Sequence, residues 1–373
     1  MAGFSNDIRV ARQLSIRSDE SFGLGVKNIR NFKKNLLVSK KCCTFAPNSS
    51  RCHPVELARL VFFIFNMNKP AYTIFDQIAL LKQRGMTFRD EAQAFNRLKN
   101  ISYYRLKGYW WDTQSDPIRH TFRPGTCFED IMERYDFDLQ LRQLLFGGIE
   151  QIEIAMRSKM IYHLSIAYGG LWYIDPALFD AQVNIYDGIS MTAHCKVLEE
   201  LQKEFDRSQE DFIKDHKRNY PGQPAEAWKI LEIASMGTLS KIYKNLKITL
   251  PERSMISNEM GVNSPHVFSG WLESVAFIRN IIAHHSRLWS RTMVKRPSLQ
   301  LNNPAGAWFT NLPRQGQIDK PFSTISCMVY LCKHLTQSDD IKQKITKLID
   351  ASPNVPIYKY GFFNNWRSEP LWN

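Results

Sequence analysis

A short polar cluster, Arg-Asn-Ile-Ile-Ala-His-His at residues 279–285, follows an apolar helical pattern at residues 271–278. Positions four apart share one side of a helix, so we expect Asn280 and His284 to be neighbours. The long side chain of Arg279 lies within reach of the same site. An imidazole that titrates near neutral pH beside a guanidinium suits chemistry at a phosphodiester. We therefore interpret Arg279, Asn280 and His284 as candidate catalytic residues.

A structural interpretation of this cluster competes with the catalytic one. Buried polar groups need partners, and Glu273 or Glu150 could neutralise Arg279 within an ion-pair network. His285 points to another side of the predicted helix, where we expect it to cap the helix or to pack.

Composition is typical of a globular protein that could contact a polyanion. The chain has 373 residues, enough for one large or two ordinary domains, and is 44% hydrophobic. Its net charge is +13, but residues 1–66 carry eleven Lys/Arg against four Asp/Glu, or +7 of that total. The remaining +6 is compatible with RNA binding and does not require it.

Cysteines and apolar runs favour a cytoplasmic protein that holds no metal. The seven cysteines form no Cys-x-x-Cys pair, which favours reduced thiols over a zinc site. The first twenty residues lack the apolar core of a secretory signal. The apolar run at residues 60–65 is far shorter than the ~20 residues that cross a bilayer, so no membrane partner is expected.

The chain divides into three predicted parts. Residues 1–66 show no helical or alternating period and are predicted as a basic, irregular extension, with Met67 as an alternative natural start. Residues 67–351 are predicted as one helical domain, and residues 352–373 as a C-terminal tail.

Periodicity and capping residues predict an all-α fold. Thr73 as N-cap and Asp76 as first-turn acid open a first helix, and Thr87 and Asp90 open in the same way a second that extends towards Gly108. A capping box at residues 126–129 opens a third. The third is expected to break at Gly147-Gly148 and to bury Ile149, Ile152, Met156 and Met160. Further helices are predicted at residues 187–217, 225–235, 238–246, 322–335 and 339–351, with one starting at Pro265. Residues 297–321 are predicted as a long loop.

Four blocks of sequence occur in an order that resembles the abortive-infection (Abi-like) phage-resistance family. The blocks are Tyr-Tyr-Arg-Leu-Lys-Gly-Tyr at 103–109, Glu150-x-x-Glu153-x-x-x-Arg157, Tyr168-Gly169-x-x-Trp172-Tyr173, and residues 279–289. The last block also resembles the Arg-x(4–6)-His signature of HEPN-type ribonucleases. The resemblance implies a HEPN-like helical bundle with additional helices.

The implied activity is metal-independent cleavage of RNA in a bacterial anti-phage system, with no cofactor. His284 would transfer protons, Arg279 would pair with phosphate oxygens, and Asn280 would orient the imidazole or bind a phosphate oxygen. Because each chain supplies one well-placed histidine, the resemblance implies a homodimer whose composite site uses two copies of the motif. The alternative is a non-catalytic protein that binds a cognate non-coding RNA on the same fold.

Two further groups of residues could take part. Residues suited to RNA binding combine cations with aromatic rings, and they are Tyr104, Arg105, Lys107, Arg287 and Arg291; core packing is the competing interpretation. Arg157 and His163 form a second Arg-x5-His pattern. For this pair an ion pair between Arg157 and Glu153, with a packed His163, is the favoured interpretation.

Overall fold

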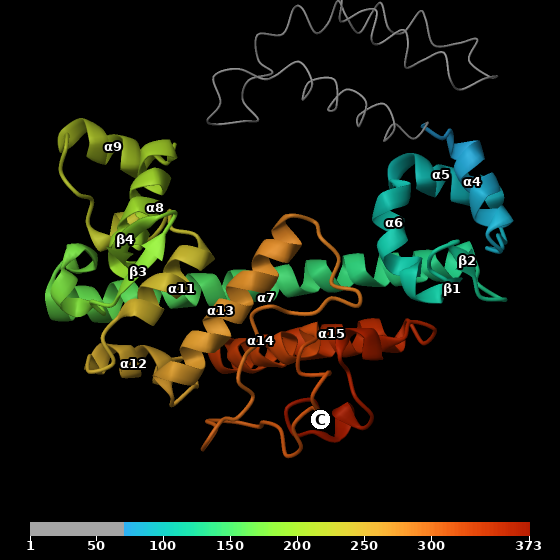
Figure 1. The fold of residues 1–373 in the computed structure, drawn as a ribbon. Helices are drawn as coiled ribbons and strands as arrows, with labels where there is room; N and C mark the ends of the chain where they lie inside the picture. The colour runs from blue at the N-terminus through green and yellow to red at the C-terminus, as the bar shows by residue number, and fades with distance from the viewer. Residues whose placement is uncertain (1–70) are drawn as a thin grey trace, which may run out of the picture. The chain divides into compact units, whose positions relative to one another are not determined.

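The longest element, helix α7, runs from Phe128 to Tyr168 without a break and contacts most of the other helices (Figure 1). Its 41 residues correspond to about 60 Å of helix. The predicted inner face is confirmed, because Ile149, Ile152, Met156 and Met160 are all buried. The predicted break at Gly147-Gly148 is wrong. A Cβ atom at Gly148 would lie 2.4 Å from Cδ1 of Ile341, so this glycine provides clearance for another helix.

The structure, a computed structural model, describes residues 71–373. The predicted extension at residues 1–66 and the alternative start at Met67 lie outside the described residues. Among residues 71–373 there are twelve α-helices and two short β-hairpins, which confirms a mainly helical fold. Within this part of the chain, no helix is both long enough and apolar enough to span a bilayer.

Three helices precede α7: α4 (Ile74–Gln83), α5 (Glu91–Asn100) and α6 (Tyr103–Trp110). The predicted Thr73 N-cap of α4 is confirmed, and Asp76 completes a capping box with it. The predicted Thr87 N-cap is wrong, because Asp90 caps α5. The single helix predicted from Thr87 towards Gly108 is also wrong. Ser102 caps a new helix, since its hydroxyl accepts a hydrogen bond from the Arg105 N–H. Strands β1 (Gln114–Asp116) and β2 (Thr121–Phe122) then form an antiparallel hairpin.

The start of α7 differs from the predicted capping box. Cys127 is the N-cap and its side chain caps nothing, while the Thr126 hydroxyl donates to the Arg123 carbonyl. The Glu129 carboxylate accepts hydrogen bonds from the backbone N–H groups of Arg89 and Asp90, each at 3.1 Å. The acid therefore fastens the segment before α5 to the first turn of α7.

Residues 187–217, predicted as one helix, contain a strand and two helices. Strand β3 (Val183–Tyr186) pairs with β4 (Ile189–Thr192) through Asp187 and Gly188, whose φ angles of 49° and 82° are those of a two-residue hairpin turn. Helices α8 (Ala193–Arg207) and α9 (Asp211–Asn219) follow. The predicted single helix is wrong because Asp187 and Gly188 favour a tight hairpin turn, which a helix cannot contain.

The next helices lead to the candidate site. They are α10 (Ala227–Ile230), α11 (Met236–Asn245), α12 (Pro251–Glu259), which the sequence analysis missed, and α13 (Pro265–Ala283). The start of α13 is confirmed: the Ser264 hydroxyl accepts from the Val267 N–H, and Pro265 occupies the first turn. Helix α13 packs on α7, α11 and α14.

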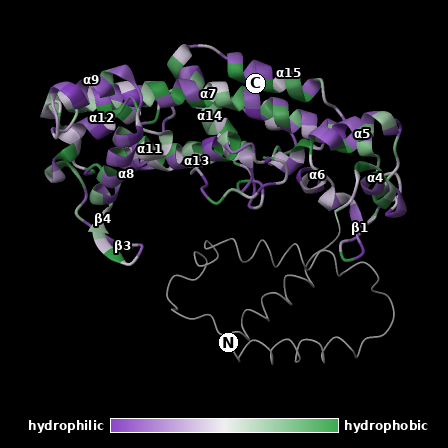
Figure 2. Cartoon of the chain, turned by 90° about the horizontal axis from the view of Figure 1, so that it is seen from above, coloured by the Kyte–Doolittle hydropathy of each residue, from purple (hydrophilic) through white to green (hydrophobic). Residues whose placement is uncertain are grey.

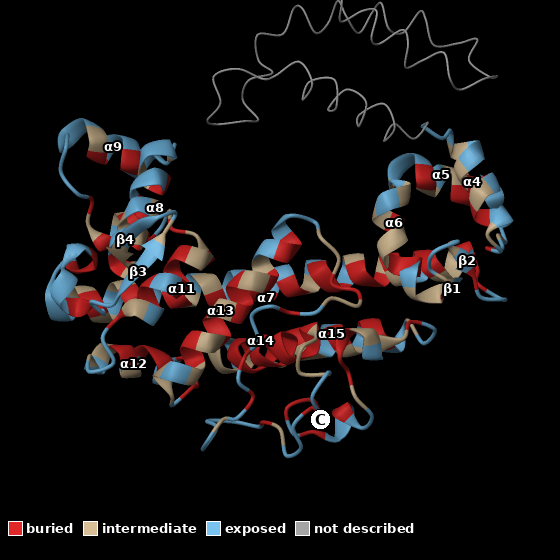
Figure 3. Ribbon diagram, viewed as in Figure 1, coloured by how far each residue is buried: buried red, intermediate tan, exposed pale blue. Residues whose placement is uncertain are grey.

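Two helices and a short C-terminal segment complete the core. Helix α14 (Pro321–Thr336) is buried along most of its length, and both it and α15 (Asp340–Asp350) pack on α7 (Figure 3). No helix or strand occurs in residues 297–320, as predicted for a long loop. Residues 352–373, the predicted tail, add the 3₁₀ turns η5 (Ile357–Tyr360) and η6 (Trp366–Ser368) and bury Tyr360, Trp366 and Trp372. Hydrophobic and hydrophilic residues alternate along most of the helices, as amphipathic packing requires (Figure 2).

Candidate functional site

Helix α13 ends at the polar cluster in a defined reversal of the chain. His284 is the C-cap, and His285 adopts the left-handed conformation with φ of 54°. The His285 N–H donates to the Ile282 carbonyl and the Ser286 N–H to the Ile281 carbonyl, both at 2.9 Å. This pair of bonds is a Schellman motif. The helix thus ends one residue before His284 rather than continuing through it, and His285 has the capping position predicted for it.

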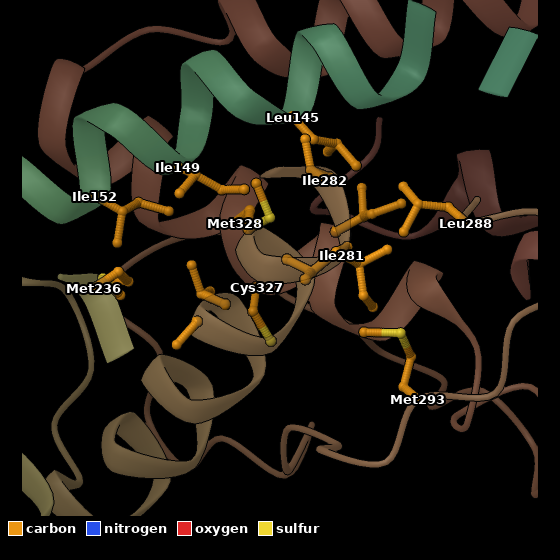
Figure 4. Packing of buried hydrophobic residues seen from close by; sticks show 14 of the residues in the cluster. Leu145, Ile149, Ile152, Met236, Ile281, Ile282, Leu288, Met293, Cys327 and Met328 are labelled. Atoms are coloured by element: carbon orange, nitrogen blue, oxygen red, sulfur yellow. The ribbon is translucent and has the colours of Figure 1, made fainter. Parts of the chain in front are cut away.

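The polar residues of the cluster face solvent, while the apolar ones enter the core. Asn280, His284 and His285 are exposed, and the Arg279 side chain is 33% exposed. Ile281 and Ile282 are buried near Leu145 and Met328 (Figure 4). The backbone of His284 stays close to helical, and its N–H donates to the Asn280 carbonyl at 3.0 Å, so the two residues lie one turn apart. The polar side chains of the cluster are therefore accessible from solvent.

Arg279 is held only loosely. Its Nε lies 3.9 Å from Oε2 of Glu153 on α7, which is too long for a hydrogen bond. The predicted partners, Glu273 and Glu150, do not pair with it, since Glu273 instead binds Lys244 and Lys295. The guanidinium of Arg279 thus keeps donors that a phosphate could use.

The second pattern, Arg157 and His163, is tied into the protein. Nε of Arg157 donates to the Leu231 carbonyl at 2.7 Å, and Nη2 donates to Glu153 at 3.2 Å, the ion pair predicted from the sequence. Nη2 also donates to the Ala234 carbonyl at 3.1 Å. Nε2 of His163 lies 2.8 Å from a Glu259 carboxylate oxygen. These contacts favour the structural role for the pair.

Helix α6 holds the turn that follows His284. Nη2 of Arg105 donates to the backbone carbonyl of His285. Gly108 lies against Arg287, because a Cβ atom at Gly108 would be 2.7 Å from Cδ and Nε of that arginine. The blocks at 103–109 and 279–289, about 180 residues apart in sequence, therefore form one local structure.

Asp138, which the sequence analysis did not single out, anchors the chain beyond His285. Its carboxylate is fully buried on α7 and accepts hydrogen bonds from the N–H groups of Leu288 and Trp289, at 3.1 and 2.8 Å. The remaining donors to this carboxylate are side chains, and they are Tyr109 at 2.8 Å, Tyr360 at 3.0 Å and Arg142 at 3.1 Å. Burial, reinforced by the Asp138 charge, raises the pKa of Tyr109 and of Tyr360. An acid and an arginine four residues apart on an apolar helix face were the available signal.

The residues predicted to bind RNA separate into exposed and structural groups. Tyr104 is 78% exposed and Trp111 is 49% exposed, and Nζ of Lys107 lies 6.0 and 5.0 Å from their ring centroids. This is an exposed arrangement of two rings around one cation.

Arg287 and Arg291 are half-buried and bind main-chain carbonyls. Nη1 of Arg287 donates to the Trp289 carbonyl, and Nε of Arg291 donates to the Arg287 carbonyl at 3.0 Å. Burial and the neighbouring Arg287 lower the pKa of Arg291. The two arginines stabilise the turn after α13, whereas Tyr104 and Lys107 are available to a ligand.

Within residues 71–373 no group of three or more His, Cys, Asp or Glu side chains is arranged to hold a metal ion.

Comparisons with known proteins identify the family of the chain. No curated protein and no solved structure matches the chain. The Abi-like protein family matches residues 96–290, just over half of the chain, from α5 through the turn anchored by Asp138. The chain therefore belongs to the Abi-like family of abortive-infection proteins.

Proposed function

We propose that this protein is a metal-independent, HEPN-type endoribonuclease that acts in abortive infection. The main support for the proposal is the solvent-exposed C-terminal end of α13. There Asn280 and His284 are exposed and Arg279 is partly exposed, on a helix that is otherwise mostly buried and that lies inside the matched region.

The chemistry uses the RNA's own 2′-hydroxyl as the nucleophile. His284 removes or returns a proton, a contribution of roughly 10²–10⁴ in rate. Arg279 pairs with the non-bridging oxygens, where negative charge grows in the transition state. Asn280, one turn before His284, orients the imidazole or binds a phosphate oxygen. The products are a 2′,3′-cyclic phosphate and a 5′-hydroxyl.

We further propose that the active form is a homodimer. In-line displacement is best served by a base and an acid on opposite sides of the phosphorus. In the cluster of one chain, His284 lies one turn after Asn280, whereas His285 is taken into the left-handed turn. Two copies of the cluster facing one phosphate supply both. The test is light scattering under activity conditions combined with mixing of unsubstituted and His284→Ala chains. A composite site predicts that the mixed dimers are inactive, whereas independent sites predict that each mixed dimer keeps half of the activity.

The decisive experiment incubates the purified chain with total RNA in EDTA and maps the cut ends. His284→Ala should abolish most cleavage while RNA binding is kept. His285→Asn is the matched control, because it removes the neighbouring exposed histidine with a residue that tolerates the left-handed conformation. Equal loss in both variants, or no cleavage by the unsubstituted chain, would contradict the proposal.

A second candidate function is RNA binding without cleavage, and the exposed rings of Tyr104 and Trp111 around Lys107 favour it. In that case a structured RNA binds tightly and is recovered intact, and Lys107→Ala weakens binding in a salt-dependent manner. The cleavage assay above separates the two functions.

A further inference from the structure

A second site lies at the other end of α13. A cavity of about 700 Å³ is bordered by the segment that joins α11 to α12, by the first turns of α13 and by residues 296–298. Its lining includes His266, which precedes His284 by 18 residues, or about 27 Å of helix. The cavity is therefore separate from the candidate catalytic cluster. Its volume is in the range of about 300–1,000 Å³ that small-molecule sites occupy.

Two of the four Lys and Arg residues in the lining already have counter-charges. Lys244 binds Glu273 at 3.0 Å, and Arg296 binds Asp319 at 2.6 Å. Burial acts to raise the pKa of Glu273, but Lys244 and Lys295 outweigh it and hold the pKa below its ordinary value. Glu273 is consequently charged and already committed to Lys244 and Lys295.

Arg253 is a buried cation without a counter-charge. Arg253 is only 8% exposed, and among residues 71–373 its guanidinium forms no ion pair with a carboxylate. Nη1 donates to the Leu246 carbonyl at 2.7 Å, the guanidinium carbon lies 5.6 Å from the Tyr243 ring centroid, and Nε has no hydrogen-bond partner. A buried charge left in this state is costly, and an anion in the cavity would offset part of that cost.

Lys247 is the fourth cation of the lining. It is exposed and, in the part of the chain that the structure describes, has no carboxylate within 4 Å. Because Glu273 is committed to Lys244 and Lys295, the remaining carboxylate of the lining is Asp180, one of whose oxygens accepts the Gln182 N–H at 3.0 Å. Lys247 and Arg253 together outweigh that one carboxylate. The N-terminal turn of α13, which borders the cavity, adds partial positive charge.

We propose that this cavity binds the phosphate group of a nucleotide-sized molecule, with Lys247 and Arg253 as the charged contacts. A phosphate matches the site because its several oxygens accept from an ammonium and a guanidinium at once. The lining also offers apolar surface from Leu246, Ile248 and Val267, against which the rest of the ligand can pack. This site is independent of the proposed cleavage chemistry.

The test is isothermal titration calorimetry of the full chain with three probes: inorganic phosphate, ATP and adenosine. Phosphate and ATP should bind and adenosine should not. Lys247→Gln should weaken ATP binding at least tenfold, and Arg253→Lys should also weaken it while circular dichroism confirms that the variant is folded. Lys347→Gln on α15 is the matched control, because it removes an exposed lysine that does not line the cavity.

Two sources of the phosphate are distinguished by a parallel titration. Trinucleotides with a 5′-phosphate or a 5′-hydroxyl are compared, and a phosphate-dependent gain that Lys247→Gln removes identifies an RNA terminus as the ligand. Affinity for ATP alone identifies a free nucleotide. The proposal is overturned if no phosphorylated probe binds at millimolar concentration, or if Lys247→Gln and Lys347→Gln behave alike.

Discussion

The two Arg-x-His patterns of this chain have almost the same spacing and very different surroundings. Arg157 donates to two main-chain carbonyls and to Glu153, and His163 lies against Glu259. Arg279 touches the same Glu153 only at 3.9 Å, and His284 is exposed at the end of its helix. Sequence spacing therefore places an arginine and a histidine on one helix. The surrounding carbonyls and carboxylates determine whether the two side chains remain available to a substrate.

The comparison is tested most strongly by removing each histidine. His284→Ala should lower the rate of RNA cleavage by about 10²–10⁴, because the proton-transfer group is lost. His163→Ala should leave the rate within about threefold, since its contact is with a surface carboxylate. Single-turnover cleavage of a labelled RNA measures both. Equal losses would show that the second pattern also belongs to the site.

The region beyond His284 depends on a buried carboxylate that the Arg157 pattern lacks. Asp138→Ala should lower the free energy of unfolding by about 3–5 kcal/mol, because it leaves Arg142 and two backbone N–H groups without their acceptor. Tyr360→Phe, which removes one donor to the same carboxylate, should cost about 1 kcal/mol. Urea denaturation followed by circular dichroism gives both values. A small effect of Asp138→Ala would contradict the anchoring role.

Substitutions of Arg157 and of Arg279 should have opposite effects on stability and on cleavage activity. Arg157→Ala leaves the Ala234 carbonyl without its donor, removes one of the two donors to the Leu231 carbonyl, and should destabilise the protein by about 1–3 kcal/mol. Arg279→Ala should cost less than about 1 kcal/mol of stability, because its one ion pair is long and partly exposed, while it removes most cleavage activity. Thermal melts and cleavage assays on the same preparations check this crossed pattern.

The smallest effect concerns the pH dependence of the His163 contact. Lys159 lowers the pKa of Glu259 against the opposing effect of burial, and His163 adds to the lowering. A carboxylate whose folded pKa is depressed stabilises the protein above its unfolded value, and that contribution disappears as the pH falls through the folded pKa. Glu259→Gln should therefore reduce stability at pH 7 by a few tenths of a kcal/mol, since Glu259 is about half exposed, and by less below pH 4.5. Urea titrations at pH 7 and pH 3.5 measure it.

The features that could be predicted from the sequence are those set by interactions between residues close together in the chain. The Thr73 cap of α4 involves a partner three residues away, and the start of α13 at Pro265 follows from the proline itself; the sequence predicted both. The cluster at residues 279–285 was visible because polar residues interrupt an apolar pattern. The environment of that cluster was not, since Asp138 acts on backbone groups 150 residues away and Arg105 on a carbonyl 180 residues away. The break predicted at Gly147-Gly148 does not occur, and the clearance that Gly148 provides concerns a residue of another helix, Ile341.

The clearance at Gly148 has a consequence for how this protein tolerates change. A methyl group there would overlap Cδ1 of Ile341, so the two positions share one fixed volume in the contact between α7 and α15. An alanine at residue 148 requires the end of the Ile341 side chain to move, and shortening residue 341 to valine or alanine removes the clash. Relatives that differ at one position are thus expected to differ at the other: a larger side chain at position 148 is expected together with a smaller one at position 341.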